Sequence, residues 1–250
     1  MYFSGQGKLF VAPIINGVPG VFRWVGNVPN FAPAFATEKF EHKESYTGQR
    51  LKDKIITTDN TATVSATLEE WSKENLALAV RGVAVEQPTT AVVDEVAPSA
   101  MVAGDIWGLK NVNVTALTLK DSTPTTPLVP VPDTDYTVDP DFGSIVILDP
   151  TGFVQPFKAS YTPGAATVVP FFTQPITEVA VRFEGVNTAD ENKKVLVEIY
   201  KVALDPTAEL GLITEEFGQF VLEGNALVDS TKDAGDEVFG QFGRMIYVDA

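Results

Sequence analysis

The chain has 250 residues, 44% of them apolar, which is enough for a sizeable hydrophobic core and excludes wholesale disorder. It contains no cysteine, so disulfides and thiolate chemistry are excluded. Its formal net charge of −15 disfavours tight binding to nucleic acid phosphates. We also expect no signal peptide and no membrane-spanning segment, because the N-terminus lacks the charge pattern of a leader and no apolar run is long enough.

The net charge is unevenly distributed. Residues 1–87 hold nine acids and nine bases, so all of the net charge lies in residues 88–250, which hold 24 acids and nine bases. The 19 glycines and 17 prolines favour strands and turns over helices. We therefore expect a mainly β protein with an acidic C-terminal part.

The first predicted elements are short antiparallel strands. Residues 8–14 form an apolar strand, INGVPG at 15–20 is a turn, and residues 21–25 form a second strand. Residues 30–44 are predicted to be extended, and a polar loop follows at 45–54.

Residues 52–71, KDKIITTDNTATVSATLEEW, alternate between two faces. One face is apolar near its end, which is typical of a half-buried antiparallel strand. Together with residues 30–44 it predicts a long hairpin whose tip lies within EKFEHKESYTGQRLKDK (38–54). The other face is entirely polar and consists of Thr57, Asp59, Thr61, Thr63, Ser65 and Thr67.

Two helices are predicted. In WSKENLALAVRG, Ser72 is a suitable N-cap and Gly82 is positioned to end the helix. A second short helix is expected to start at Asp205, with Pro206 in its first turn.

The middle of the chain, residues 88–175, differs in composition from the rest. It begins with a linker-like stretch and continues as short strands between turns, so we expect a small β-rich module inserted into a main domain of residues 1–87 and 176–250. The main pattern returns in ITEVAVRFEGVN, KKVLVEIYKVAL, EEFGQFVLEGNALVD and GRMIYVDA.

The single histidine, His42, invites a catalytic or metal-binding interpretation. Acid–base catalysis needs a partner in a closed pocket, and zinc needs several His or Cys ligands. Neither is expected at a hairpin tip in a chain without cysteine, so we interpret His42 as a solvated or interface residue. The acids around it are interleaved with bases, a pattern typical of a solvated face or of a complementary protein contact.

Other candidate sites are weaker. Asp133, Asp135, Asp139 and Asp141 leave a calcium site open, but their spacing does not match a calcium loop and DPDFG is better explained as a hairpin turn. GQG at 5–7 lacks the rest of a dinucleotide motif, and no serine nucleophile motif is present. We expect no enzyme activity, cofactor or metal.

The run of motifs in the N-terminal third resembles the tail tube (major tail) proteins of long-tailed, siphovirus-type bacteriophages. The motifs are YFSGQGKLFVAP, FRWVGNVPNF, EKFEHKESYTGQRLKDK and ATLEEWSKENLALAVRG. DPTAELGLITEEFGQFVLEGNALVD and FGRMIYVDA are similar to the closing strands of that family. The resemblance covers residues 1–85 and 176–250, whereas the middle of the chain matches loosely.

The resemblance implies a β-sandwich or barrel tail-tube fold with one packed α-helix and a long hairpin. Such subunits form hexameric rings that stack into the hollow tail of the virion, after synthesis in the cytoplasm of the host bacterium. The implied partners are other copies, the tape measure protein, the tail terminator and the distal tail proteins. Viral DNA passes through the tube without specific binding.

The resemblance also implies roles for the hairpin. We expect Thr57, Asp59, Thr61, Thr63 and Ser65 to face the lumen, where a surface without bases would let DNA slide; an outward or solvent-facing orientation remains open. The inserted module is expected on the outer wall. Contacts between rings or subunits are expected from Lys43, Glu44, Tyr46, Gly48, Arg50, Lys52 and Asp53.

Two other classes of function remain. The chain could be another tail or surface β protein of a virion, such as a tail-tip, decoration or carbohydrate-binding module, because fold alone does not fix function. A carbohydrate-binding module should expose aromatic side chains, whereas we expect Trp24, Trp71 and Trp107 to be packed. An enzyme would need a pocket that the sequence does not indicate.

Overall fold

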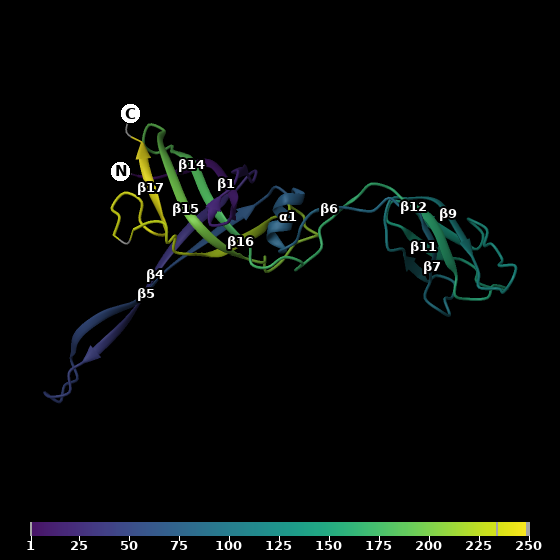
Figure 1. Ribbon diagram of the computed structural model, residues 1–250, viewed down its shortest axis with the longest axis horizontal. Helices are drawn as coiled ribbons and strands as arrows, with labels where there is room; N and C mark the ends of the chain where they lie inside the picture. The colour runs from purple at the N-terminus through teal and green to yellow at the C-terminus, as the bar shows by residue number, and fades with distance from the viewer. Residues whose placement is uncertain (1, 234, 249–250) are drawn as a thin grey trace. The chain divides into compact units, whose positions relative to one another are not determined.

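The computed structural model describes residues 2–233 and 235–248. These residues are mainly β, with several antiparallel sheets and one helix, which confirms the predicted fold class (Figure 1). The chain divides into a core unit, Met1–Val83 with Val169–Ala250, and an inserted unit, Ala84–Val168. No helix in the described part of the chain could span a membrane.

The core unit is built on a nine-stranded antiparallel sheet. The strand order is β2-β1-β14-β15-β16-β5-β4, with β3 beside β1 and β17 beside β15. Of the expected closing strand GRMIYVDA, the last two residues lie outside the described ones. The bounds are β1 Gly5–Ile15, β2 Val18–Pro19, β3 Arg23–Trp24, β4 Asn30–Lys43, β5 Lys52–Leu68, β14 Glu178–Asn187, β15 Lys193–Asp205, β16 Phe220–Ala226 and β17 Gly243–Val248.

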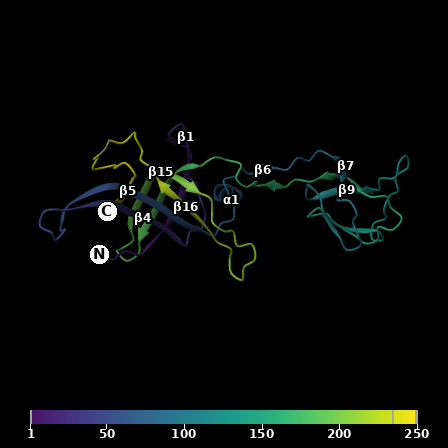
Figure 2. The same ribbon diagram turned by 90° about the horizontal axis from the view of Figure 1, so that it is seen from below.

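The strand β15 has two different neighbours along one edge. Its first half pairs with β17 and its last four residues pair with β16. Residues of β1 and β14 share one hydrophobic core with residues of β16, β5 and β4, so these strands form two layers over it. Figure 2 shows this unit from a second direction. The stacked rings of Phe31 and Phe183, whose centroids are 5.7 Å apart, join the two layers.

The helix α1 (Lys73–Ala79) begins as predicted. Ser72 Oγ accepts a hydrogen bond from the amide of Asn75 at 3.3 Å, the interaction expected of an N-cap. The buried Asn75 side chain then fixes the helix to the core unit by donating to the carbonyl oxygens of Val25 (2.8 Å) and Glu70 (2.9 Å).

The C-terminal end of the helix and the second predicted helix differ from expectation. Arg81, and not Gly82, takes the left-handed conformation (φ 50°). Gly82 is required for space, because a Cβ there would lie 2.2 Å from the carbonyl oxygen of Pro170. The prediction of a second helix is wrong. Asp205 is the last residue of β15, and residues 206–219 connect it to β16 without a helix.

The inserted unit is a sandwich of two small sheets. Their orders are β10-β11-β8 and β7-β12-β9, and a separate pair, β13-β6, lies where the chain enters and leaves the unit. Trp107, Phe157 and Tyr161 are among the buried residues of its own core. The bounds are β6 Val85–Glu86, β7 Val92–Val96, β8 Ile106–Gly108, β9 Val114–Lys120, β10 Tyr136–Asp139, β11 Ser144–Ile147, β12 Lys158–Pro163 and β13 Thr167–Val168.

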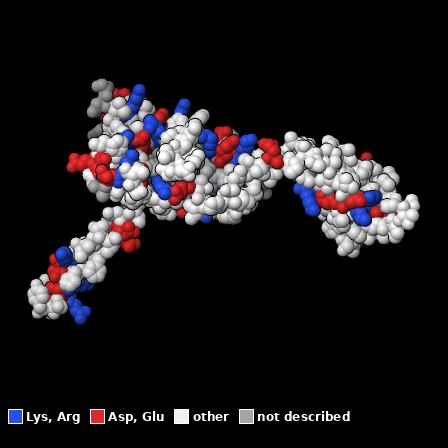
Figure 3. All heavy atoms as spheres, in the orientation of Figure 1, with Lys and Arg blue, Asp and Glu red and all other residues white. Residues whose placement is uncertain are grey.

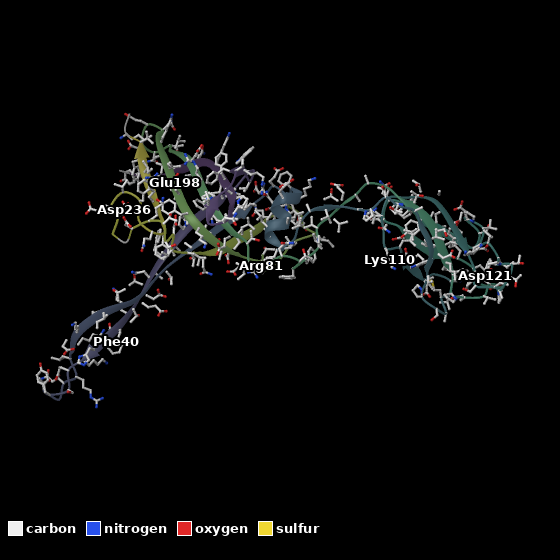
Figure 4. All side chains as sticks on the ribbon, viewed as in Figure 1. Phe40, Arg81, Lys110, Asp121, Glu198 and Asp236 are labelled. Carbon is white, nitrogen blue, oxygen red and sulfur yellow. The ribbon has the colours of Figure 1, made fainter. Side chains whose placement is uncertain are left out.

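A buried carboxylate organises the loops of the inserted unit (Figure 4). Asp121 accepts hydrogen bonds from the amides of Thr123 (3.0 Å), Leu128 (2.6 Å) and Val154 (3.0 Å), and from the Thr123 hydroxyl (2.6 Å). Burial by itself would raise the pKa of Asp121, but these donors outweigh it and lower the pKa to about 2. The charged form therefore holds three segments together.

The core of the core unit can be tested with one pair of leucines. Leu68 is fully buried between the layers, whereas Leu212 is 80% exposed. We expect Leu68→Ala to lower the free energy of unfolding of the core unit by about 2–5 kcal/mol, because it leaves a cavity. Leu212→Ala, the same chemical change, should alter it by less than about 0.5 kcal/mol. Urea unfolding followed by fluorescence measures both, and equal losses would contradict the described core.

Candidate assembly interface

The hairpin of β4 and β5 extends beyond the sheet that holds it (Figure 1). The two strands pair along their length, from Asn30 with Thr67 to Lys43 with Lys52. The next strand, β16, pairs only with the last seven residues of β5. The ten residues 52–61 of β5, about 33 Å at roughly 3.3 Å per residue, therefore have β4 as their one strand partner among the described residues.

This distal part exposes large apolar side chains on both faces. Phe40, Ile55 and Ile56 are exposed, and Phe35, which pairs with Ala62 at the base of this part, is 80% exposed. Figure 4 shows Phe40 on the projecting part of the hairpin. Phe40 pairs with Ile56 on one face and Ile55 lies on the other, so neither face can turn inward to a core of the same chain. Exposed apolar clusters of this kind mark interaction surfaces.

The polar face of β5 is interrupted by a β-bulge. Glu38 pairs with Asp59, but the next residue of β4, Lys39, pairs with Thr57, so Thr58 is unpaired. Paired residues share a face and consecutive residues of β4 alternate between faces. Thr57 therefore lies on the face of Phe35, opposite Asp59, and it leaves the polar row that simple alternation predicted.

The remaining polar row is continuous from Asp59 to Thr67 and faces away from the core, since the alternating residues of β5 from Ala62 to Leu68 are buried. Its neighbours on β16 are Val221, Glu223 and Asn225. No lysine or arginine belongs to this paired surface. Its partners on β4 are Glu38, Ala36, Ala34, Ala32 and Asn30.

The hairpin tip, residues 44–51, is organised by one carboxylate. Glu44 is buried and accepts hydrogen bonds from the amides of Tyr46 (2.8 Å), Thr47 (2.9 Å) and Leu51 (3.3 Å), and from the Thr47 hydroxyl. These bonds, the one from the Thr47 hydroxyl first, lower the pKa of Glu44 to about 2 although desolvation opposes them. Glu44 shapes the expected contact surface and does not present its charge on it.

Other charged residues of the hairpin pair with each other. Lys52 Nζ lies 2.5 Å from the Glu41 carboxylate, and His42 Nδ1 lies 2.5 Å from Asp53 Oδ1. Both pairs are solvent-exposed, so His42 lies in no closed pocket. Red and blue atoms alternate over the tip in Figure 3.

The predicted contact residues therefore separate into two groups. Glu44, Lys52 and Asp53 bind within the hairpin, whereas Tyr46 and Arg50 are exposed and form no side-chain hydrogen bond or ion pair with the described residues. Lys43 is exposed likewise, and Gly48 supplies the left-handed turn (φ 81°).

The sequence did not indicate the apolar clusters of the distal hairpin or the exposed residues of 206–219. Asp205 followed by Pro206 predicts the start of a helix, so an exposed loop is not expected in this segment. An apolar residue beside charged neighbours in a projecting hairpin, as in Lys39–Phe40–Glu41, is the signal that could have found the first group.

The four aspartates that left a calcium site open lie in turns of the inserted unit. Asp139 Oδ1 accepts from the amides of Asp141 (3.1 Å) and Phe142 (3.3 Å), as in the predicted hairpin turn between β10 and β11. Asp135 accepts from the amide of Val131 at 2.6 Å. Within the described ranges, no group of three or more acidic or histidine side chains is arranged to hold a metal ion.

The tryptophans are not all packed. Trp107 is buried, and Trp71 packs edge-on against Phe220 with ring centroids 5.5 Å apart. Trp24 is half exposed and lies 5.3 Å from the ammonium group of Lys8, so the expectation of packing is wrong for this residue.

Sequence comparison places nearly all of the chain in one family. The model of the family described as "Protein of unknown function UCP028589" matches residues 2–246, which includes both the core unit and the inserted unit. No curated protein matches the chain.

The hydrogen bonds that the Glu44 carboxylate accepts, which we call the Glu44 clamp, make the tip sensitive to acid. Because its pKa is about 2 in the folded chain and about 4.5 ordinarily, the charged form stabilises the tip at neutral pH, and this contribution is lost as the pH falls from 4.5 through 2. We expect Glu44→Gln to speed hydrogen exchange at the amides of Tyr46 and Thr47 roughly tenfold at pH 6. NMR measures this; the exposed Glu38→Gln is the matched control, and unchanged exchange in the Glu44 variant would contradict the clamp.

Proposed function

The chain belongs to this family, whose description states no activity, and we propose that it is a structural tail tube subunit of a long-tailed bacteriophage. In this proposal copies form hexameric rings, and the rings stack into the hollow tail through which DNA leaves the virion. The observation that carries the proposal is the projecting part of the hairpin, for which the described residues of the core unit provide no neighbouring strand.

The surface of the hairpin supports self-assembly. A single copy leaves Phe40, Ile55 and Ile56 in water on the distal hairpin and Phe35 in water at its base, whereas a second copy can cover them. Burial of apolar area stabilises by about 25 cal/mol per Å². The positive and negative charges around these residues would fix the register of the contact and would disfavour non-specific binding to other proteins.

The outer edge of β4 supports ring formation. β4 is the last strand in the order of the sheet, and along its 14 residues no other described strand pairs with its outer edge. Such an edge pairs readily with other chains and is a hazard for a monomer. Closing the sheets of several copies into one barrel would remove that edge, and we propose that the tube does this.

The polar row supports a lumen-facing role for this part of the sheet. From Asp59 to Thr67 the row and its neighbours present hydroxyl, amide and acidic side chains, alanines and one valine, and no base. DNA phosphates would find no cation to pair with there, so DNA could slide past. Thr57 is excluded from this surface by the bulge.

The remaining partners follow from the same proposal. The inserted unit has its own core and is proposed to lie on the outer wall, where it leaves the lumen free. The tape measure protein would fill the lumen before DNA, and the tail terminator and distal tail proteins would bind the two ends. The proposed location is the virion tail.

Tube formation gives the first test. Negative-stain microscopy of the concentrated protein should show rings or tubes. Deletion of residues 46–52 should abolish tubes, because the tip is the proposed contact between rings. The variant should keep the unfolding transition of the core unit, since the tip adds nothing to the core. Normal tubes from the deletion variant would refute the proposal.

The orientation of the wall gives a second test. The chain has no cysteine, so Thr63→Cys and Val93→Cys provide single labelling sites on the polar row and on the inserted unit. Both positions are exposed in the single chain. In assembled tubes, a polymer-linked maleimide should modify Val93→Cys fully and Thr63→Cys at least tenfold more slowly.

Equal labelling of the two variants in tubes would contradict the lumen-facing row. Protection of Val93→Cys would contradict the outer position of the inserted unit. Unassembled protein, in which both sites should react alike, is the control.

A further inference from the structure

The loop that joins β15 to β16, residues 206–219, displays apolar side chains that the core does not use. Leu212 is 80% exposed, Ile213 99% and Phe217 91%. We call this segment the β15–β16 loop.

The loop is held at both ends. The amide of Thr207 donates to the carbonyl oxygen of Ala79 at 2.8 Å. At the other end, Trp71 Nε1 donates to the carbonyl oxygen of Gly218 at 2.7 Å. The two ends of the loop are therefore attached to the core unit. Between them Leu210 packs against the core, whereas Leu212, Ile213 and Phe217 stay exposed.

The loop is also acidic. Residues 206–219 contain three glutamates and no base. The carboxylates of Glu209, Glu215 and Glu216 form no hydrogen bond or ion pair with any residue that the structure describes. A partner that suits this loop should be apolar and positively charged.

The hairpin tip, taken together with the adjoining strand residues of 38–54, has those properties. Residues 38–54 hold five bases and four acids, in a chain whose net charge is −15. Arg50 and Lys54 are exposed and, within the described ranges, have no carboxylate partner. Tyr46 and Leu51 beside them are exposed apolar residues.

The tip and the loop lie at opposite ends of one strand. β5 leaves the tip at Lys52 and ends at Leu68, which pairs with Phe220, the residue directly after the loop. Its 17 residues span about 56 Å at roughly 3.3 Å per residue. A copy therefore cannot place its tip on its own loop, and contact between the two must join different copies.

From this complementarity we infer that the β15–β16 loop is the surface on which the hairpin tip of a second copy docks. Different surfaces meet in such a contact, so it repeats from copy to copy instead of closing on itself. It would stack copies along the direction of β5. The inference rests on the proposed function and adds the acceptor of the hairpin to it.

Charge reversal on each side tests the contact. The loop-reversed variant carries Glu215→Lys with Glu216→Lys, and the tip-reversed variant carries Arg50→Glu with Lys54→Glu. Each creates like charges across the contact, so each alone should raise the protein concentration needed for tubes by about 100-fold. An equal mixture should form tubes again, because each tip then meets a loop of opposite charge.

The matched control is Asp233→Lys with Glu237→Lys, the same change of charge in another acidic loop of the core unit. It should assemble like the original chain. Sedimentation and negative-stain microscopy measure the original chain, the two reversed variants, their mixture and the control, and the unfolding transition checks that each variant folds.

The outcomes separate the two proposals. If the original chain forms no rings or tubes, the proposed function fails. If it forms tubes and the loop-reversed variant does so at the same concentration, or the mixture of reversed variants stays unassembled, the docking inference is wrong. An equal loss in the control variant would also overturn the assignment to this loop.

Discussion

The strand β5 extends beyond the sheet that it belongs to, and the exposed surface of the hairpin follows from this extension. The last seven residues of β5 are paired on both sides and carry the buried row of the core, whereas residues 52–61 have only β4 beside them. An antiparallel ladder keeps its backbone hydrogen bonds wherever it runs, but it cannot supply a core on its own. The backbone of the distal hairpin is therefore paired between its two strands, but its apolar side chains have no core to pack against. Phe40 and Ile56 remain exposed to water.

Two buried carboxylates of the chain are hydrogen-bonded within their own loops, whereas several large apolar side chains stay exposed to water. The Glu44 carboxylate accepts hydrogen bonds from donors of its own tip, and the Asp121 carboxylate accepts them from loops of the inserted unit. The tip and residues 206–219 expose apolar side chains, and beside these lie bases (Arg50, Lys54) and acids (Glu215, Glu216) that form no ion pair with a described residue. Such surfaces bind selectively, since the apolar part supplies free energy and the charges fix the partner and the register.

Much of this could be predicted from the sequence, because alternation and capping are local. The strand at 52–68 and the N-cap at Ser72 are confirmed. The bulge that turns Thr57 to the other face depends on how two strands pair, which no single-strand pattern contains. The helix expected at Asp205 does not form, because Asp205 pairs with Glu223 of β16, a tertiary interaction that a local sequence signal does not contain. Likewise, Glu44 was expected at a contact by its position, whereas its burial follows from the folding of the loop back onto it.

The central claim is that the hairpin of one copy is completed by another copy. A helical reconstruction of the assembled protein by electron cryomicroscopy tests it most directly. The account predicts that residues 44–51 of each copy lie against residues 206–219 of a copy in the next ring, with Thr61 and Thr63 directed at the tube axis. Hairpins that extend into solvent without touching another copy would contradict it.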